Sequence, residues 1–376
     1  MEIAKRKKIK ELIWMVIENS IQKSKTEKPV LIVNSFERKT GIGRYVEILH
    51  SAVCEIGALL TLDFIPPTKI KSDTFEGIHL KGISAEKFPN LSKSINTMFQ
   101  GPLFARPLSG YANKFRILHY SDPGIKPLNN DGIITIHDLT MLGKSSISDV
   151  YGRVCKGNLK KYRHFQNVIV DSDYVKGEVE NNGFEGKVHL IHLAPSPNFF
   201  PLNKDKAEIK MQLGLPINKK LLLSISTKSE RKNLPFLSRA VEALGNDYSL
   251  VRVGDGMMNA INYSNVDDST LNMLYNASDA LLFPSKEEGF GFPAIEALAT
   301  GLPVLALDIP TMNEVTGNAF PLSDGTIADY VKNIIEVTNS QDDLKKIAIQ
   351  RAKHFSLEKF KHSMLNLYNT ILSNYI

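Results

Sequence analysis

Two glutamates, Glu288 and Glu296, stand on either side of a glycine-containing turn and are separated by seven residues. A carboxylate accepts hydrogen bonds from hydroxyl groups such as those of a sugar. Between the glutamates lie Phe290, Gly291 and Phe292. Their backbone amides can point at one spot if a helix begins there, and helix N-termini attract anions such as phosphate. The combination would suit a sugar phosphate, although on spacing alone an ordinary tight turn with solvated glutamates is the commoner arrangement.

The residues around this turn predict one strand–loop–helix–strand unit. The apolar run Ala280–Phe283 is typical of a buried parallel strand, and the loop Pro284–Phe292 follows it. Pro293 fits the first position of a helix, Gly301 fits the position just after its end, and Val304–Leu307 indicates the next strand. Open α/β sheets bind ligands at the carboxyl ends of their strands, so we expect the loop to line a ligand site.

A longer stretch around the two glutamates carries a family resemblance. The sequence F-P-S-K-E-E-G-F-G-F-P-A-I-E-A-L-A-T-G-L-P-V-L-A-L-D-I-P-T-M-N-E-V, which starts at Phe283, resembles the donor-site signature of retaining glycosyltransferases of family 4, the glycosyl transferases group 1. Glu288 and Glu296 occupy the positions of the two family glutamates. The resemblance therefore favours a ligand site over an ordinary turn.

The resemblance implies a GT-B fold of the α/β class. In this fold two Rossmann-like domains face each other across a cleft, and a C-terminal helix crosses back to the N-terminal domain. We expect residues 1–197 to form the N-terminal acceptor-side domain and residues 198–355 the C-terminal nucleotide-sugar-binding domain. Residues 356–376 would form the crossing helix. The proline-marked stretch A-P-S-P-N-F-F-P-L would link the two domains.

A basic pair, Arg231 and Lys232, stands at the junction of a loop and a predicted helix in the second domain. Positive charge at a helix start opposes the helix dipole, so a bound anion would explain the pair, while solvated surface charge is the commoner alternative. The segment E-R-K-N-L resembles the family's E-P-R-K-N-L, which implies that Lys232 holds the donor diphosphate with Arg231 beside it. This chain has Ser226 and Glu230 where the family often has glycine and proline.

The first domain supplies further candidate residues. Gly41 and Gly43 in T-G-I-G-R-Y follow the predicted strand Val30–Val33 and would free a loop for close approach to a ligand. The third glycine of a dinucleotide fingerprint is missing, so a nicotinamide cofactor is not expected. The resemblance implies that these glycines face the donor diphosphate. It also implies that His137, after the strand Ile133–Ile136, reaches the donor sugar. Because histidine can be neutral near pH 7, it can hydrogen-bond a hydroxyl without a fixed charge, and we interpret His137 as a positioning residue more than as a classical base.

Two other polar features of the first domain are interpreted as structural. The residues Asp171-Ser172-Asp173 have the spacing of a D-x-D manganese site. Ser172 nevertheless fits the N-cap of a helix over 173–182, so no metal is expected. His119 follows another short apolar strand, and we interpret this lone histidine as a hydrogen-bonding residue of the framework.

The composition of the 376 residues, 43% hydrophobic and 23% charged, is that of a soluble globular protein with room for two domains. No apolar run reaches membrane-spanning length, and no signal-peptide pattern opens the chain. Cys54 and Cys155 are too few for a disulfide framework, so we expect a reducing cytoplasm. The net charge of +6 favours an anionic partner, and no nucleic-acid motif accompanies it.

Residues 2–24 predict an amphipathic helix with a basic start. With Trp14 on it, this helix could lie on an anionic membrane surface, at the inner face of the cell membrane. Packing of the helix on its own domain is an alternative of equal weight. The family often works at membranes on lipid-linked acceptors.

Together these features predict a retaining hexosyltransferase. It would move a hexose from a nucleotide diphospho-sugar, of the GDP-mannose or UDP-glucose type, to a hydroxyl of a glycan or lipid-linked acceptor in cell-surface polysaccharide synthesis. Lys232, Arg231 and the amides of residues 290–292 would stabilise the leaving diphosphate without a metal or other cofactor. Glu296 would accept from the ribose hydroxyls and Glu288 from the hexose hydroxyls.

Two alternatives share this fold and stay open. A sugar-nucleotide 2-epimerase would act on the donor without an acceptor. A non-catalytic nucleotide-sugar-binding partner subunit would bind without turnover, and the intact glutamate pair argues against it. A nucleic-acid-binding protein is not favoured, because the charge is dispersed after the first helix.

Overall fold

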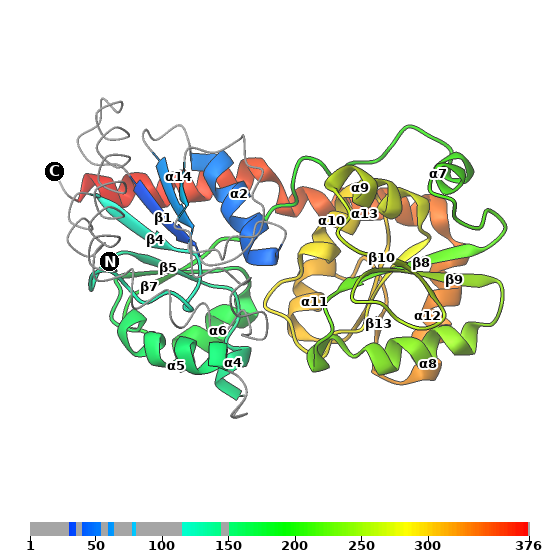
Figure 1. Ribbon diagram of the computed structural model, residues 1–376, viewed down its shortest axis with the longest axis horizontal. Coiled ribbons are helices and arrows are strands. Elements are labelled where there is room, and N and C mark those ends of the chain that lie inside the picture. The colour runs from blue at the N-terminus through cyan, green and yellow to red at the C-terminus, as the bar shows by residue number, and fades with distance from the viewer. Residues whose placement is uncertain are drawn as a thin grey trace, which may run out of the picture. The chain divides into compact units, whose positions relative to one another are not determined.

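The structure is a computed structural model that describes residues 30–34, 40–53, 59–63, 77–79, 115–143 and 150–374. The predicted helix over residues 2–24 and Cys54 lie outside these described residues. The chain divides into two compact units, shown in Figure 1. Unit 1 consists of Met1–His192 and Phe360–Ile376, and unit 2 consists of Leu193–Lys359. Each unit is an α/β structure with its own sheet.

Unit 1 is built on a parallel sheet with the strand order β3-β2-β1-β4-β5-β6-β7. Its strands are β1 (Val30–Asn34), β2 (Leu59–Asp63), β3 (Gly77–His79), β4 (Ile117–Tyr120), β5 (Ile133–Ile136), β6 (Asn167–Val170) and β7 (Lys187–Leu190). Strand β1 pairs with β2 on one side and with β4 on the other. The strand order reverses between β1 and β4, and ligands bind at the carboxyl ends of such strands.

Helices cover both faces of this sheet. They are α2 (Gly41–Val53), α4 (Thr140–Gly143), α5 (Val150–Tyr162), α6 (Asp173–Asn181) and α14 (Leu357–Ser373). Figure 1 shows α2 and α14 on one face, with α5 and α6 on the other. Because unit 1 includes Phe360–Ile376, most of α14 returns to the N-terminal part of the chain.

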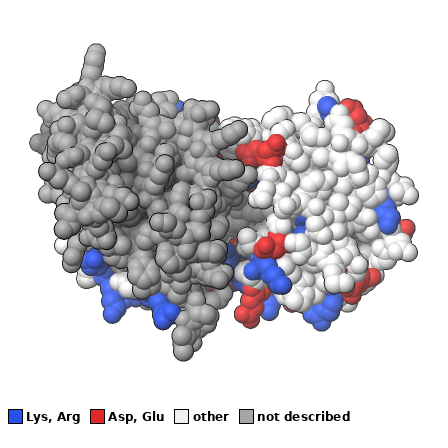
Figure 2. All heavy atoms as spheres, viewed as in Figure 1, with Lys and Arg blue, Asp and Glu red and all other residues white. Residues whose placement is uncertain are grey.

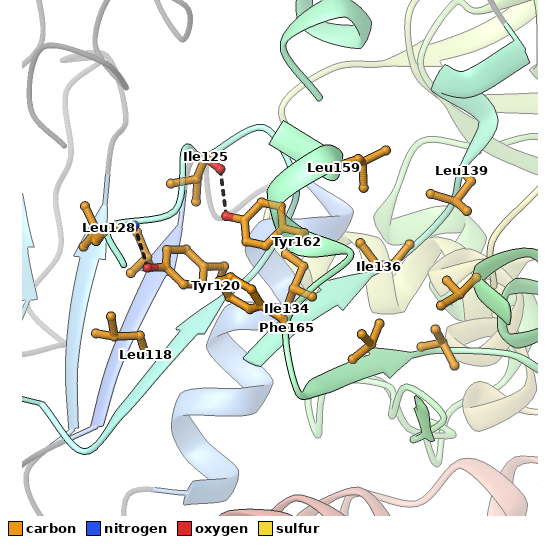
Figure 3. Packing of buried hydrophobic residues seen from close by; sticks show 14 of the residues in the cluster. Leu118, Tyr120, Ile125, Leu128, Ile134, Ile136, Leu139, Leu159, Tyr162 and Phe165 are labelled. Atoms are coloured by element: carbon orange, nitrogen blue, oxygen red, sulfur yellow. Dashed lines mark hydrogen bonds between the residues drawn. The ribbon is translucent and has the colours of Figure 1, made fainter. Parts of the chain in front are cut away.

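Aromatic packing fixes the loop that follows β4. The rings of Tyr120, Tyr162 and Phe165 pack edge to face, with centroids 4.9–5.8 Å apart. Figure 3 shows how their polar tips are satisfied: Tyr162 Oη donates to the carbonyl of Ile125 over 2.7 Å, and the amide of Leu128 donates to Tyr120 Oη over 2.8 Å. Buried tyrosines usually find such partners. These contacts anchor a loop at the carboxyl edge of the sheet.

Unit 2 is built on a second parallel sheet, with the strand order β10-β9-β8-β11-β12-β13. Its strands are β8 (Lys220–Ser226), β9 (Tyr248–Gly254), β10 (Ala260–Tyr263), β11 (Ala280–Phe283), β12 (Val304–Leu307) and β13 (Leu322–Ser323). Strand β8 pairs with β9 on one side and with β11 on the other, so the loops after β8 and β11 leave the sheet side by side.

Helices surround this sheet as well. They are α7 (Lys206–Gln212), the short 3₁₀ helix η2 (Glu230–Lys232), α8 (Leu234–Leu244), α9 (Asp268–Ala277), α10 (Phe292–Thr300), α11 (Pro310–Thr316), α12 (Ile327–Asn339), α13 (Gln341–Ala352) and the 3₁₀ helix η3 (Lys353–Phe355). Figure 1 shows α9 and α10 on one face of the sheet, and α8 and α12 on the other.

The strand–loop–helix–strand unit predicted in this part of the chain is confirmed. Strand β11 covers Ala280–Phe283 and β12 covers Val304–Leu307, as predicted. Helix α10 begins at Phe292, one residue before the expected start, so Pro293 lies inside its first turn. Gly301 ends the helix with a φ of 82°, a left-handed conformation that glycine adopts at low cost.

The surface of unit 2 carries charges of both signs. On the face seen in Figure 2, lysines and arginines are interspersed with aspartates and glutamates. Exposed ion pairs such as Lys204–Glu208, with 3.6 Å between Nζ and Oε1, contribute at most about 1 kcal/mol to stability.

In the part of the chain that the structure describes, no helix has the length and apolar character needed to cross a membrane.

Candidate functional site

Glu288 lies between two cations at the carboxyl edge of the unit 2 sheet. Its Oε2 accepts from Arg231 Nη1 over 2.6 Å, and its Oε1 accepts from Lys232 Nζ over 2.5 Å. The cations belong to η2, in the connection after β8, and Glu288 belongs to the loop after β11. Pairing of β8 with β11 therefore brings together residues that are 56 and 57 positions apart in the sequence.

The charges of this trio determine its protonation. Glu288 is only 6% exposed, and burial alone would raise the pKa of its carboxyl group. Lys232 and Arg231, together with a hydrogen bond from Ser285, outweigh burial and lower the pKa. The carboxylate is therefore ionised at neutral pH, and the trio of one anion and two cations carries a net positive charge. Such a cluster suits an anionic ligand.

Further contacts hold the two cations in place. Arg231 Nη1 also donates to the carbonyl of Glu287 over 3.2 Å, and the amide of Lys286 donates to the carbonyl of Arg231 over 2.9 Å. Lys232 Nζ lies 5.3 Å from the centroid of the Phe283 ring, at the end of β11. The Lys232 side chain is 12% exposed. The loops after β8 and β11 thus form one connected structure.

Helix α10 starts immediately after this cluster. Its N-cap, Gly291, has a φ of 115°, and a Cβ at this position would lie 3.2 Å from Met312 Cε and 3.3 Å from Phe283 Cζ. The backbone conformation favours glycine here, and the space for a side chain is tight. Within the described residues, the amides of Gly291 and Phe292 donate to no protein acceptor. Two N–H groups at a helix start are therefore available to a bound anion.

Glu296 and Phe290 flank this helix start from the protein interior. Glu296, in α10, is buried and accepts from Tyr275 Oη of α9 over 2.7 Å, which orients its carboxylate. Phe290 is also buried and packs edge to face on Phe355, with centroids 5.4 Å apart. The sequence did not identify Tyr275 as the partner of Glu296, because the two residues lie on different helices.

His137 is the central candidate in unit 1. It follows β5, is 15% exposed, and its Nδ1 donates to Oδ2 of Asp171, which follows the neighbouring strand β6. Burial would lower the pKa of His137, but the carboxylate of Asp171, helped by Asp122 and Asp138, outweighs burial and raises it. The buried carboxylate thus favours the imidazolium form of His137, and the role of His137 toward a donor sugar stays a prediction.

A network of buried, hydrogen-bonded side chains lies beside His137. The Tyr45 ring packs edge to face on His137, with centroids 4.8 Å apart, and Tyr45 Oη is 2.8 Å from Thr135 Oγ1. His119 Nε2 is hydrogen-bonded to the same Oγ1 over 2.7 Å, and His119 Nδ1 to Tyr368 Oη of α14 over 2.5 Å. Burial, helped by His137, lowers the pKa of His119 to about 3. His119 is thus neutral and structural, as interpreted from the sequence.

The three residues of the D-x-D segment have separate environments. Asp171 pairs with His137, and Ser172 caps α6 by accepting from the amide of Val175 over 3.2 Å. Asp173 is exposed in the first turn of α6. Among the described residues, no cluster of three or more histidine, cysteine, aspartate or glutamate side chains is arranged to hold a metal ion.

The expected glycine loop after β1 is wrong in one respect. Helix α2 begins at Gly41, so Gly41 and Gly43 lie in its first turn, and neither is among the glycines with a positive φ. The amide of Gly43 donates to Thr40 Oγ1 over 3.1 Å, so Thr40 caps the helix and the two glycines are helical rather than part of a loop. A role of the two glycines toward a diphosphate stays a prediction.

Comparison with known proteins shows a family likeness. Residues 205–355 match the family model of glycosyl transferases group 1. The matched stretch is less than half of the chain and lies within unit 2. The O-antigen chain mannosyltransferase RfbU of Salmonella typhimurium is 27% identical over 80% of this chain and 89% of its own length. The O-antigen chain mannosyltransferase B of Escherichia coli is 26% identical over 54% of this chain and 60% of its own length, so less than two thirds of that relative is spanned.

Solved structures identify the fold of this chain as GT-B. Sucrose-phosphate synthase from Thermosynechococcus elongatus superposes with a TM-score of 0.74 at 17% identity, covering 92% of this chain and 100% of that structure. Anabaena HepE, solved in complex with UDP and glucose, superposes with a TM-score of 0.71 at 14% identity, covering 91% and 100%. At such identities the likeness concerns the fold alone.

One residue near the site was not identified from the sequence. Arg252 of β9 is fully buried. Its Nη1 donates to the carbonyls of Ser224 and Val253 over 3.1 and 2.9 Å, and its Nη2 donates to the carbonyl and hydroxyl of Ser226. Burial lowers the pKa of Arg252. An arginine inside the apolar strand L-V-R-V was the available signal. The guanidinium group of Arg252 thus fixes the end of β8, the strand that leads into the connection with Arg231 and Lys232.

We expect Arg252→Lys to destabilise the protein by about 1–3 kcal/mol, because a single ammonium cannot serve the buried acceptors that the guanidinium fork now satisfies. Urea unfolding followed by fluorescence measures this loss as a lower midpoint. Arg239→Lys is the matched control, since Arg239 is exposed on α8. Equal midpoints for Arg252→Lys and the wild type would contradict a structural role of the fork.

Proposed function

We propose that this chain is a retaining hexosyltransferase. It transfers a hexose from a nucleotide diphospho-sugar to a hydroxyl of a glycan or lipid-linked acceptor in cell-surface polysaccharide synthesis. The observation that carries this proposal is the pairing of buried Glu288 with Arg231 and Lys232, and the amides of Gly291 and Phe292, which have no acceptor among the described residues and follow Glu288 after β11. Cations and helix-start amides are the groups that bind a diphosphate.

The same groups support a role in catalysis. Negative charge grows on the leaving diphosphate as the bond to the sugar breaks. Arg231, Lys232 and the two amides are held in fixed positions before any ligand binds, which is the arrangement that stabilises developing charge. We infer that these groups suffice without a divalent metal.

Carboxylates and His137 would recognise the sugar side of the donor. Glu296, oriented by Tyr275, would accept from the ribose hydroxyls, and Glu288 would accept from the hexose hydroxyls while it holds the two cations. His137 would donate to the hexose. Both a front-face return attack and a covalent intermediate retain the anomeric configuration, and NMR of the product tests retention itself.

Mannose is the hexose that the relatives favour. RfbU and mannosyltransferase B are both named O-antigen chain mannosyltransferases, and a lipopolysaccharide core mannosyltransferase LpsB of Rhizobium meliloti is a further relative, 30% identical over 26% of this chain and 30% of its own length. We therefore propose GDP-mannose as the first donor to test and UDP-glucose as the second. A growing surface polysaccharide or lipid-linked glycan is the proposed acceptor. Residues 2–24 would lie on an anionic membrane or on unit 1.

A thermal-shift screen of GDP-mannose, UDP-glucose and dTDP-sugars tests donor binding. A donor at about 100 times its Kd should raise the melting temperature by roughly 5–10 °C, because it stabilises the folded state by about 2.7 kcal/mol. The donor that shifts melting is then incubated with glycan acceptors in the presence of EDTA, and release of the nucleoside diphosphate is measured. We expect release that depends on the acceptor and persists with the chelator.

The outcomes separate the alternatives. Conversion of the donor sugar without any acceptor would indicate a 2-epimerase. Binding of a donor with no turnover on any acceptor would indicate a non-catalytic partner subunit. Absence of a melting shift with every nucleotide sugar would contradict the proposed donor site.

A further inference from the structure

Asp171 is a buried acid that the proposed reaction does not use. It is 1% exposed, its Oδ2 accepts from His137 Nδ1, and its Oδ1 has no hydrogen-bond partner among the described residues. Burying a carboxylate is costly unless it is paired, so its presence at this position calls for an explanation. The spacing of Asp171-Ser172-Asp173 is that of a D-x-D manganese site, but Asp171 pairs with His137 instead.

The backbone sets the geometry of this pair. Strands β5 and β6 are adjacent and parallel, with Ile136 opposite Val170. The residues that follow, His137 and Asp171, therefore leave the sheet side by side at its carboxyl edge. Ser172 caps α6 immediately afterwards and fixes the backbone at Asp171. The relative position of the two side chains is thus determined by regular structure rather than by a mobile loop.

The pair leaves one nitrogen of the imidazole for a ligand. Nδ1 carries a proton toward Asp171, and Nε2 is buried with no protein partner among the described residues. The edge contact of Tyr45 restricts rotation of the ring. An imidazolium donates from both nitrogens, whereas a neutral ring protonated at Nδ1 can only accept at Nε2. The charge of the pair therefore decides whether Nε2 is a donor or an acceptor.

We propose that Asp171 is a positioning residue that holds His137 as an imidazolium and aims its Nε2–H at a ligand oxygen. The ligand oxygen has the chemistry of a sugar hydroxyl or of an oxygen that gains negative charge during the reaction. This inference rests on the proposed function for the identity of the ligand. The state of His137 itself can be measured without any assumption about the reaction.

The other titratable groups described around His137 either raise its pKa, as Asp171 does, or are uncharged. Asp122, after β4, and Asp138, beside His137, raise its pKa along with Asp171. His119 of β4 is neutral at physiological pH, and burial keeps the Tyr45 hydroxyl of α2 protonated by raising its pKa. Asp171 is the member of this set that hydrogen-bonds to the ring directly. Its replacement should therefore have the largest effect on the charge.

The first experiment measures the pKa of His137 by NMR in the full chain labelled at histidine Cε1. His137→Gln assigns the resonance by its loss. In the wild type we expect a pKa above the ordinary 6.5. In Asp171→Asn, which keeps the shape of the side chain but removes its charge, we expect the pKa to fall by about one unit or more. Asp173→Asn, two residues further along and exposed, is the control and should leave the pKa unchanged.

The second experiment measures kcat/KM against pH with the donor identified above. The imidazolium is present below the folded-state pKa and is lost as the pH rises through it. Wild-type activity should therefore decline on the alkaline side, and Asp171→Asn should move that decline to lower pH by the same shift that NMR shows. A merely structural aspartate would lower activity equally at every pH. Melting curves verify that Asp171→Asn is folded.

The NMR and kinetic measurements test separate parts of the inference. An unchanged His137 pKa in folded Asp171→Asn would overturn the inference, whatever the protein catalyses. A lowered pKa with an unshifted pH profile would also overturn it, because Nε2–H would then not serve the reaction. A lowered pKa in a protein that transfers no hexose from any donor would leave Asp171 with its assigned effect on His137 and would contradict the proposed function instead.

Discussion

Glu288→Gln should lower turnover on the order of 100-fold while the protein stays folded. Glutamine keeps the shape of the side chain but replaces a charged double acceptor by one amide oxygen. Arg231 and Lys232 would then lose the carboxylate that now fixes both, at 2.6 and 2.5 Å. A displacement of about 1 Å of a catalytic group commonly costs on the order of 100-fold in rate. Steady-state kinetics with saturating donor measures the loss in kcat.

Glutamine is a better substitution here than alanine. Removing one partner of a buried ion pair commonly costs about 3–5 kcal/mol, because the remaining charges are left uncompensated. Alanine would therefore mix a loss of folded protein with a loss of function. Glu230→Gln is the matched control, since Glu230 directly precedes Arg231 and is exposed. Wild-type turnover in Glu288→Gln would remove Glu288 from the proposed site.

Local signals in the sequence were sufficient for the strand–loop–helix–strand unit of β11, α10 and β12. The apolar run Ala280–Phe283, Gly301 at the helix end and the run Val304–Leu307 gave β11, α10 and β12 because strands and helix ends depend on neighbouring residues. The first turn of α2 was instead interpreted as a loop. Glycine has a low helix propensity, so Gly41 and Gly43 indicated a loop, whereas capping by Thr40 overrides that preference.

The partners within the candidate site depend on the sheet rather than on spacing. The sequence singled out Glu288 and Lys232 separately, but their ion pair follows from β8 lying beside β11. His137 and Asp171 were likewise noticed apart, and the adjacency of β5 and β6 makes them a pair. A parallel strand order is a long-range property that no local pattern contains. The effect of this pairing on the pKa of His137 could therefore not be predicted from the local sequence.

The second large effect concerns Lys232, whose ammonium combines two contacts. Nζ donates to Glu288 Oε1 and lies over the Phe283 ring, 5.3 Å from its centroid. Lys232→Met keeps a long flexible side chain that can pack on the same ring, so the fold should be retained. The substitution removes the charge from one side of Glu288 and leaves Arg231 as its partner.

We expect Lys232→Met to lower kcat on the order of 100-fold or more, the usual cost of removing one group that stabilises charge developing in the transition state. The KM for the donor should change much less, because the diphosphate carries more charge in the transition state than in the bound donor, and kcat and kcat/KM should therefore fall together. Lys228→Met, at an exposed position in the same connection after β8, is the control. A rise in KM at constant kcat would mean that Lys232 binds the donor and transition state equally, and that the charge on the leaving group is stabilised by Arg231 and the helix-start amides instead.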